Sequence, residues 1–258
     1  MLYLSGDLKG GVMGRFKLAL AQLPSVKGNI ERNIESHIHA VKVAVRKKAS
    51  IVVFPELSLT GYEPDLAEQL ALKIDDRQLS PLADLAADCG VWLVVGAPIR
   101  QKNGIAIGSL VFSPQGEISV YLKIHLHPGE EKWFVPGSEY LSLNIEGETV
   151  ALAICADVCN PGHVATYEKQ GASVYVAGVL ITPTGYPEDS QQLANYALEH
   201  NLLVAIANFN QPTGGYSTAG CSAAWGPEGE IVSASDTASQ LVCVERDDEG
   251  WCSEIVSL

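Results

Sequence analysis

Three apolar, strand-like runs of the chain each end in a different ionisable residue. The first run leads to the carboxylate of Glu56, the second to the amine of Lys123 and the third to the thiol of Cys155. A partly desolvated carboxylate can accept a proton from a thiol, and a fixed ammonium can stabilise a thiolate and then the oxyanion of a tetrahedral intermediate. The three residues therefore indicate a catalytic set with Cys155 as the nucleophile.

Strand-like and helix-like patterns alternate along most of the chain and would position these residues. The region 29–48 is typical of an amphipathic helix, because Ile30, Ile34 and Ile38 recur on one face. Further helices are predicted at 65–72, 78–89, 161–170 and 187–200. Strands are predicted at 16–22, 51–54, 91–96, 105–112, 116–122, 140–145, 149–154, 173–178, 202–207, 220–225, 230–235 and 240–245. This alternation predicts an α/β fold of mixed sheets with helices outside.

Length, composition and charge bear on the number of domains and on the kind of partner. The chain has 258 residues, of which 47% are apolar and 18% charged, and this is typical of a folded globular protein. We expect one domain over residues 14–258, with the Gly-rich residues 1–13 as a flexible tail. A formal net charge of −13 argues against a nucleic-acid partner.

Two further patterns bear on membranes and on the cellular compartment. No apolar run approaches the ~20 residues that span a bilayer, and none has the form of a secretory signal, so no membrane partner is expected. The six cysteines do not show the spacing of a disulfide framework. We therefore expect free thiols and a cytoplasmic protein.

The segments around the three ionisable residues resemble, in order, the Glu, Lys and Cys motifs of the nitrilase superfamily of carbon–nitrogen hydrolases. They are FPELSLTGY (54–62), YLKIHL (121–126) with FVPG (134–137), and AICAD (153–157) with Pro161. Each motif alone is weak, but three in the same order are specific. The likeness covers about residues 16–246.

This resemblance implies a four-layer α-β-β-α sandwich, usually paired into a homodimer or higher homo-oligomer. It implies Glu56 as general base, Lys123 as oxyanion stabiliser, Cys155 as nucleophile and the backbone N–H of Ala156 as a second oxyanion donor. A supporting glutamate follows the lysine in the family, and Glu130 and Glu131 both qualify here. Counting back from Phe134 and Pro136 slightly favours Glu130, whereas a one-residue deletion in the loop would favour Glu131. No metal or organic cofactor is implied.

The pattern departs from the family at several positions. Ala156 stands where many members have an aromatic residue, and Gly162-His163 stands where several amidase branches have Glu after the proline. Tyr62, His127 and Thr182 are candidate pocket residues, and the loops 182–186 and 208–216 are expected to face the site. The set Cys155, Cys159 and His163 could be read as metal ligands, but Cys155 is expected to precede the helix, so no metal site is predicted.

The sequence therefore predicts a hydrolase that acts on a non-peptide C–N bond of a small amide through a thioester acyl-enzyme. Nitrile hydrolysis is disfavoured, since nitrile-cleaving branches continue the cysteine with Trp-Glu and this chain continues with Ala156-Asp157. The alternatives are an N-carbamoyl-type amidohydrolase, an ω-amidase, or a catalytically silent family member acting as a binding subunit.

Overall fold

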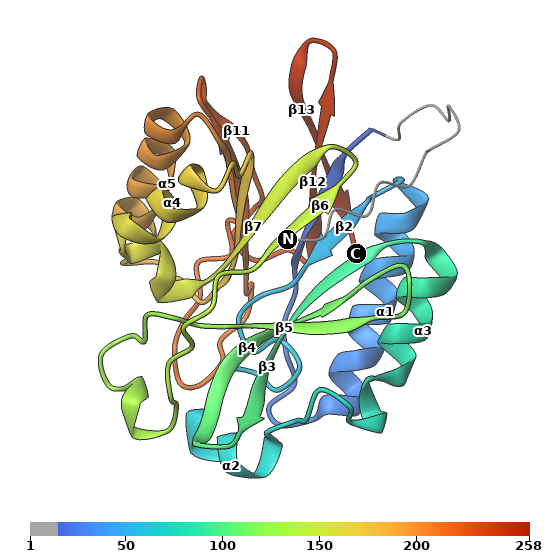
Figure 1. The fold of residues 1–258 in the computed structure, drawn as a ribbon, viewed down its shortest axis with the longest axis vertical. Helices are drawn as coiled ribbons and strands as arrows, with labels where there is room; N and C mark the ends of the chain where they lie inside the picture. Colours follow the sequence, from blue (N-terminus) through green and yellow to red (C-terminus); the bar gives the residue numbers. More distant parts are fainter. Residues whose placement is uncertain (1–14) are drawn as a thin grey trace, which may run out of the picture.

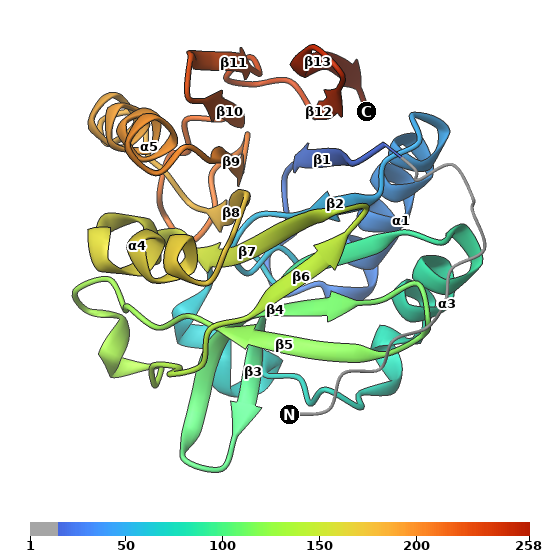
Figure 2. The ribbon, with the colours of Figure 1, turned by 45° about the horizontal axis from the view of Figure 1, so that its top comes forward.

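The computed structural model describes residues 15–258 and contains thirteen β-strands and five α-helices in that range. The flexible tail expected at residues 1–13 lies outside the described residues. Figures 1 and 2 show two β-sheets face to face, with helices on the outer side of each. This arrangement confirms the predicted α/β fold with four layers.

Seven strands form the first sheet. They are β1 (Lys17–Gln22), β2 (Ile51–Val53), β3 (Trp92–Gln101), β4 (Gly104–Phe112), β5 (Ile118–Leu122), β12 (Gln240–Asp247) and β13 (Gly250–Ser257), in the order β13-β12-β1-β2-β3-β4-β5. Six strands form the second sheet. They are β6 (Ser142–Ile145), β7 (Glu148–Ile154), β8 (Val174–Val179), β9 (Leu203–Asn208), β10 (Ala223–Gly226) and β11 (Gly229–Ser233), in the order β11-β10-β9-β8-β7-β6.

Each sheet has a parallel centre. Strands β1, β2 and β3 run parallel in the first sheet, and β7, β8 and β9 run parallel in the second. Central parallel strands are covered on both faces, which is why β2 and β8 are buried along their whole length and almost wholly apolar. Glu56 and Cys155 follow β2 and β7, so both come shortly after the carboxyl ends of central strands.

Helices cover the two outer faces. Helices α1 (Ile30–Arg46) and α3 (Ser80–Cys89) pack on the first sheet, and α4 (Pro161–Lys169) and α5 (Tyr186–His200) pack on the second (Figure 2). The short helix α2 (Ala67–Leu70) and two 3-10 helices, η1 (Pro64–Leu66) and η2 (Arg77–Leu79), lie between β2 and β3. Two more 3-10 helices are η3 (Glu130–Lys132) and η4 (Cys155–Cys159). Within residues 15–258, no helix combines the length and the apolar character needed to cross a membrane.

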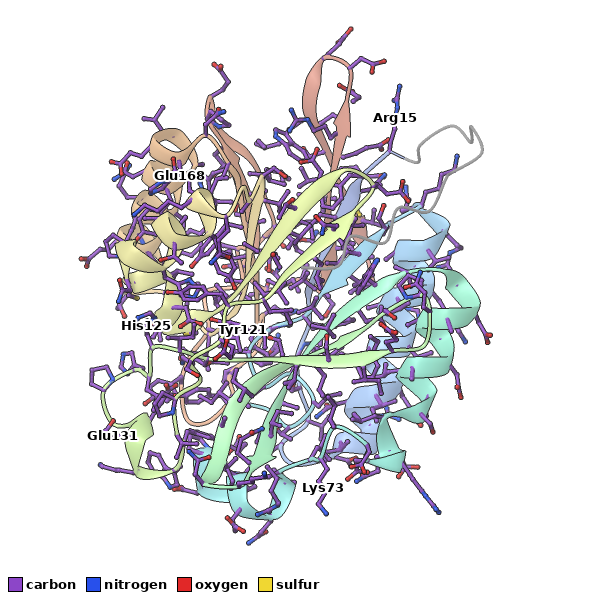
Figure 3. All side chains as sticks on the ribbon, viewed as in Figure 1. Arg15, Lys73, Tyr121, His125, Glu131 and Glu168 are labelled. Carbon is purple, nitrogen blue, oxygen red and sulfur yellow. The ribbon has the colours of Figure 1, made fainter. Side chains whose placement is uncertain are left out.

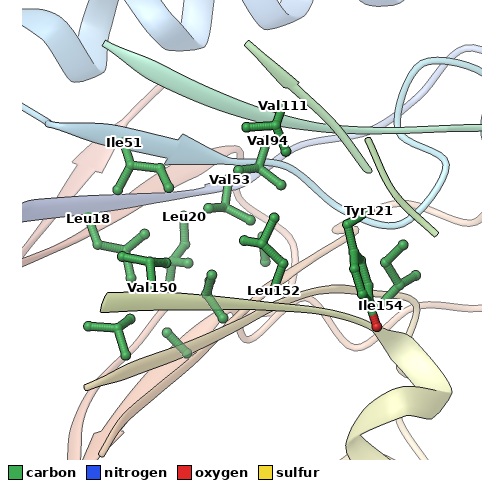
Figure 4. Packing of buried hydrophobic residues seen from close by; sticks show 14 of the residues in the cluster. Leu18, Leu20, Ile51, Val53, Val94, Val111, Tyr121, Val150, Leu152 and Ile154 are labelled. Carbon is green, nitrogen blue, oxygen red and sulfur yellow. The ribbon is translucent and has the colours of Figure 1, made fainter. Parts of the chain in front are cut away.

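The inner faces of the two sheets share one hydrophobic cluster. Leu18, Ile51 and Val53 from the first sheet pack with Val150 and Leu152 from the second (Figure 4). All five side chains are at most 1% exposed. Burying a side chain of this kind contributes about 1.5–3 kcal/mol, so this layer holds the two sheets in one relative position.

Two strand predictions were incomplete. Strand β3 continues to Gln101, past the predicted end at residue 96, although it contains Pro98. The Pro98 carbonyl accepts a hydrogen bond from the Leu72 N–H (2.9 Å), and the proline nitrogen lies on that same edge, so the β3–β4 ladder loses no bond. Strand β13 was not predicted, because its sequence GWCSEIVS is exposed or half-buried and has a weak apolar pattern.

Candidate active site

Glu56 lies in a tight turn after β2 and is 1% exposed. The turn fits only because two neighbouring positions have no side chain. A Cβ on Gly96 of β3 would overlap the backbone at Leu57, and a Cβ on Gly178 of β8 would overlap the Phe54 carbonyl oxygen. Since β3 and β8 belong to different sheets, the carboxylate is held where the two sheets meet.

Lys123 pairs with two buried carboxylates. Its backbone N–H donates to the Ile107 carbonyl of β4 (2.9 Å), so the residue continues the β5 ladder. Its Nζ lies 2.7 Å from Glu56 Oε1 and 2.9 Å from each carboxylate oxygen of Glu130. The Tyr62 hydroxyl donates to Glu130 Oε1 (2.7 Å). A buried charge needs partners of this kind, and the ammonium, with 0% of its side chain exposed, has three contacts to carboxylate oxygens.

The two candidate supporting glutamates differ in position. Glu130 is 3% exposed, and its Oε2 also accepts the backbone N–H of His127 (2.7 Å). Glu131 is exposed and accepts the N–H of Gly129 (2.7 Å). Figure 3 shows Glu131 on the outer side of the loop that follows β5. The structure therefore places Glu130, rather than Glu131, beside Lys123.

Cys155 is the first residue of η4, directly after β7. Its φ of 42° lies in the left-handed region, which is costly for a residue other than glycine. The Sγ atom lies 3.6 Å from the Leu180 carbonyl oxygen. Residues strained in this way cluster at functional sites, and here the strain coincides with the predicted nucleophile.

Burial and neighbouring charges set the protonation of these groups. Desolvation raises the pKa of Cys155 well above its ordinary value, the charge of Glu56 raises it further, and Lys123 lowers it. Desolvation also raises the pKa of Glu56, against the opposing effect of Lys123. Burial alone would lower the pKa of Lys123, but the charges of Glu56, Cys155 and Glu130 raise it overall. The raised pKa of Cys155 favours its protonated thiol.

Asp157 was not among the predicted site residues, yet it connects two of them. Its buried carboxylate accepts backbone N–H bonds from Ile124 (3.1 Å), His125 (2.8 Å) and Ile154 (3.0 Å). The Tyr121 hydroxyl donates to it at 2.7 Å, reaching across the core from β5 (Figure 4). The segment after Lys123 is thereby joined to the turn of Cys155. The sequence shows Asp157 only as an acidic residue near a turn. Acidic residues are common in turns, so this position gave no signal that Asp157 connects two segments.

One group of side chains could be considered for a metal ion. His125, Asp157 and His163 bring three donor atoms within 4.8 Å of one another. These atoms already have partners in the chain: Asp157 Oδ1 accepts the His125 N–H, and the two ring nitrogens of His163 contact the hydroxyls of Tyr121 (3.0 Å) and Tyr175 (2.8 Å). We interpret the group as a hydrogen-bonded network. Within residues 15–258, Cys155, Cys159 and His163 do not form a metal-ligand cluster.

A cavity of about 250 Å³ exposes the thiol. It is lined by all four predicted pocket residues, Tyr62, His127, Ala156 and Thr182, together with Glu56, Glu130 and Cys155. The predicted loops contribute Thr182 and Gly185 from one and Tyr216 from the other. Lys123 is not among the lining residues, but its Nζ contacts Glu56 and Glu130, which are. Cys159 and Asp189 line it without having been predicted as pocket residues, because each is brought there by a helix whose orientation depends on packing.

Sequence comparison relates this chain to known proteins. A model of the carbon-nitrogen hydrolase family matches residues 17–251. The nitrilase of Pyrococcus abyssi is 27% identical over 90% of this chain and 89% of its own length. The omega-amidase NIT2 of Xenopus tropicalis is 26% identical over 91% of this chain and 90% of its own length. The glutamine-dependent NAD(+) synthetase of Thermotoga maritima is 30% identical over 76% of this chain, which spans only 36% of that protein.

Structure comparison leads to an amidase from Nesterenkonia sp. AN1. A glutamate-to-leucine mutant of it, with the acetamide moiety of fluoroacetamide added covalently at the active-site cysteine, matches with a TM-score of 0.82 at 25% identity and 92% coverage of both chains. A cysteine-to-alanine mutant in complex with butyramide matches with a TM-score of 0.81 at 26% identity, covering 89% of this chain and 90% of that one. The fold is therefore shared over nearly the whole of both proteins.

Proposed function

The chain belongs to the carbon–nitrogen hydrolase family, and we propose that it is a cysteine-dependent amidase that releases ammonia or an amine from a small amide. One observation carries the proposal. Glu56 Oε1 is held by Lys123 at 2.7 Å, whereas Glu56 Oε2 is buried and has no hydrogen-bond partner in the described part of the chain. A free carboxylate oxygen in the same cavity as a protonated thiol is suited to accept its proton.

The proposed reaction has two halves. Glu56 takes the proton of Cys155 as Sγ attacks the amide carbonyl, and the negative charge on the carbonyl oxygen is stabilised by the Lys123 ammonium and the Ala156 N–H. The C–N bond then breaks, and the leaving ammonia or amine takes the proton from Glu56. Water, deprotonated by Glu56, attacks the thioester and releases the acid and the thiol.

Each element of the site supports one step. The raised pKa of Cys155 means that deprotonation must be coupled to attack, which is the task of a general base. Glu130 holds the ammonium from a second side, so Lys123 keeps its position when Glu56 becomes protonated. In a glutamate-to-leucine mutant of the Nesterenkonia amidase, whose fold this chain shares, the acetamide moiety of fluoroacetamide is added covalently at the active-site cysteine, so that cysteine is a nucleophile.

An ω-amidase activity is a second candidate, favoured by the similarity to the Xenopus omega-amidase over most of both chains. The substrates of the two candidates overlap in the reacting group, so one assay covers both. A catalytically silent binding protein would give the opposite result in that assay.

The test measures ammonia release from a panel of small aliphatic amides, ω-amides and N-carbamoyl amines. We expect Cys155→Ala to abolish release, Glu56→Gln to lower kcat by about 10²–10⁴-fold and Lys123→Ala by about 10²–10³-fold. Cys159→Ala is the matched control, since Cys159 lines the same cavity, and it should retain activity. Mass spectrometry of the quenched reaction should find the acyl group on Cys155. Release that persists in Cys155→Ala, or the lack of release from every compound, would contradict the proposal.

A further inference from the structure

The charged side chains that line the catalytic cavity are all acidic. They belong to Glu56, Glu130 and Asp189, and no lysine or arginine is among the lining residues. The nearby cation, Lys123, is fully buried and already shared between the two glutamates. The one imidazole, His127, lies on an exposed loop with Nδ1 3.2 Å from the Pro128 carbonyl oxygen. A substrate carboxylate bound away from the reacting carbonyl would therefore lie among acidic side chains, and no lysine or arginine of residues 15–258 lines the cavity to pair with it.

Asp189 is the acidic residue of this cavity that has no task in the proposed reaction. It lies in the first turn of α5, and its carboxylate has neither an ion-pair partner nor a side-chain hydrogen bond within residues 15–258. Desolvation raises its pKa, and the charge of Glu188 adds to this effect. A positively charged group in the cavity would offset both the desolvation of Asp189 and its repulsion by Glu188.

The carboxylate of Asp189 lies beside two other residues of the cavity wall. A Cβ on Gly185 would lie 3.3 Å from Asp189 Oδ2 and 3.4 Å from Thr182 Oγ1, which places the three residues together, and all of them line the cavity. Cys159, four residues after the nucleophile, is also close: desolvation raises its pKa, and Asp189 is the next largest cause. The acidic group therefore shares the cavity with the nucleophile.

The remaining walls suit a short hydrocarbon chain. Val158, Leu180 and Ile181 supply apolar surface, and Tyr62 and Tyr216 form an edge-to-face pair with ring centroids 5.8 Å apart. Aromatic faces also attract cations. An acidic group and an electrophile site joined by apolar walls would accept a molecule with an amide at one end, methylene groups between and an ammonium at the other end.

We propose that the preferred substrates are amides that carry a positive charge, of the ω-amino amide class, and that Asp189 binds their ammonium group. This inference rests on the proposed amidase function, because it names the substrate class of the same cavity. Asp189 is then a specificity-determining residue. A neutral amide of the same length can still react, but it lacks the charge-assisted hydrogen bond that Asp189 provides.

The test compares three amides of equal chain length: 5-aminopentanamide (cationic), pentanamide (neutral) and glutaramate (anionic), with the corresponding butanamide series as a second length. We expect kcat/KM to fall in that order in the unmodified enzyme. Asp189→Asn should lower kcat/KM for the cationic amide by about 10- to 100-fold and leave the neutral amide nearly unchanged. Asp189→Lys should reverse the order toward glutaramate. Glu188→Gln is the matched control, because Glu188 neighbours Asp189 but does not line the cavity, and it should change neither.

The outcomes separate this inference from the proposed function. Hydrolysis that favours pentanamide or glutaramate, or a loss in Asp189→Asn that is equal for all three amides, overturns the role of Asp189 while the amidase function stands. If none of the three releases ammonia, calorimetric binding of the same amides to Cys155→Ala decides the role of Asp189, while the amidase function is judged on the full panel of amides and N-carbamoyl amines. Tighter binding of the cationic amide that is lost in the Cys155→Ala, Asp189→Asn double variant supports the inference, and any other order overturns it.

Discussion

The backbone N–H of His125 donates a hydrogen bond to the Asp157 carboxylate at 2.8 Å, and this bond joins the two halves of the active site. His125 lies two residues after Lys123, beyond the end of β5 in the first sheet, and Asp157 lies two residues after Cys155, beyond the end of β7 in the second. The same carboxylate also accepts the N–H of Ile154, just before the nucleophile. One buried side chain therefore sets the distance between the ammonium and the thiol.

Replacing Asp157 by asparagine should disturb these hydrogen bonds without removing a reacting group. The amide can present an acceptor to only one side, so at least one buried N–H loses its partner, at a cost of about 1–3 kcal/mol. We expect a lower melting temperature and a kcat reduced by about 10²-fold, because small misplacements of reacting groups are costly. Tyr121→Phe removes the hydroxyl contacts with Asp157 and His163 but keeps the Asp157 carboxylate and its backbone N–H bonds, so its loss of activity should be smaller. Equal activity of Asp157→Asn and the unmodified enzyme would contradict this role.

The pH dependence of kcat/KM should report the charge around Glu56. Activity requires the ionised carboxylate, and burial raises the pKa of Glu56 above its ordinary 4.5, so activity should be lost on the acid side with a midpoint above that value. The charge of Glu130 contributes to this shift, so Glu130→Gln should move the midpoint to lower pH. Glu131→Gln is the control and should leave the profile unchanged, since Glu131 does not contact Lys123. A shift in Glu131→Gln but not in Glu130→Gln would reverse the assignment.

Gly178→Ala, in β8 of the second sheet, should displace the turn that carries Glu56 after β2 of the first sheet. The new Cβ would meet the Phe54 carbonyl oxygen and lie 3.1 Å from the Glu56 nitrogen, so the turn that carries Glu56 must move. We expect destabilisation of about 1–3 kcal/mol in urea unfolding and a fall in kcat. Gly226→Ala, in the same sheet, is the matched control, because its Cβ would meet side chains only, those of Ile231 at 3.3 Å and Trp251 at 3.8 Å. Unchanged kcat in Gly178→Ala would show that the turn adapts.

His163 should make the protein less stable in mild acid. Desolvation lowers its pKa from 6.5 to about 4, so between these values the unfolded chain binds a proton that the folded chain does not. Stability therefore falls as the pH drops from about 7 to 5, by roughly 2 kcal/mol from this residue. Urea unfolding at pH 7 and pH 5 should show that the free energy of unfolding falls less in His163→Gln than in the unmodified protein, by roughly 2 kcal/mol. The exposed His39→Gln is the control, and an equal loss in His163→Gln and the unmodified protein would contradict the prediction.

The sequence alone determined the elements and the order of the reacting residues. Apolar periodicity is local, so the strands before Glu56, Lys123 and Cys155 and the amphipathic helix α1 could be predicted from neighbouring residues. The motif resemblance then predicted the fold class and the four layers. Strand β13 was not predicted because its residues are exposed or half-buried, so the apolar periodicity typical of a strand is weak there.

Tertiary structure alone decided how the site is held and lined. Counting back from residues 134–137 favoured Glu130 over Glu131 only slightly, and the choice was decided by which side of the loop faces Lys123. Asp157 finds its partners some 30 positions away, at Ile124 and His125, and Asp189 reaches the cavity only because α5 packs beside η4. Hydrogen-bond partners and cavity walls come from the packing of two sheets against each other. That packing depends on the whole core, so it could not be read from any single segment.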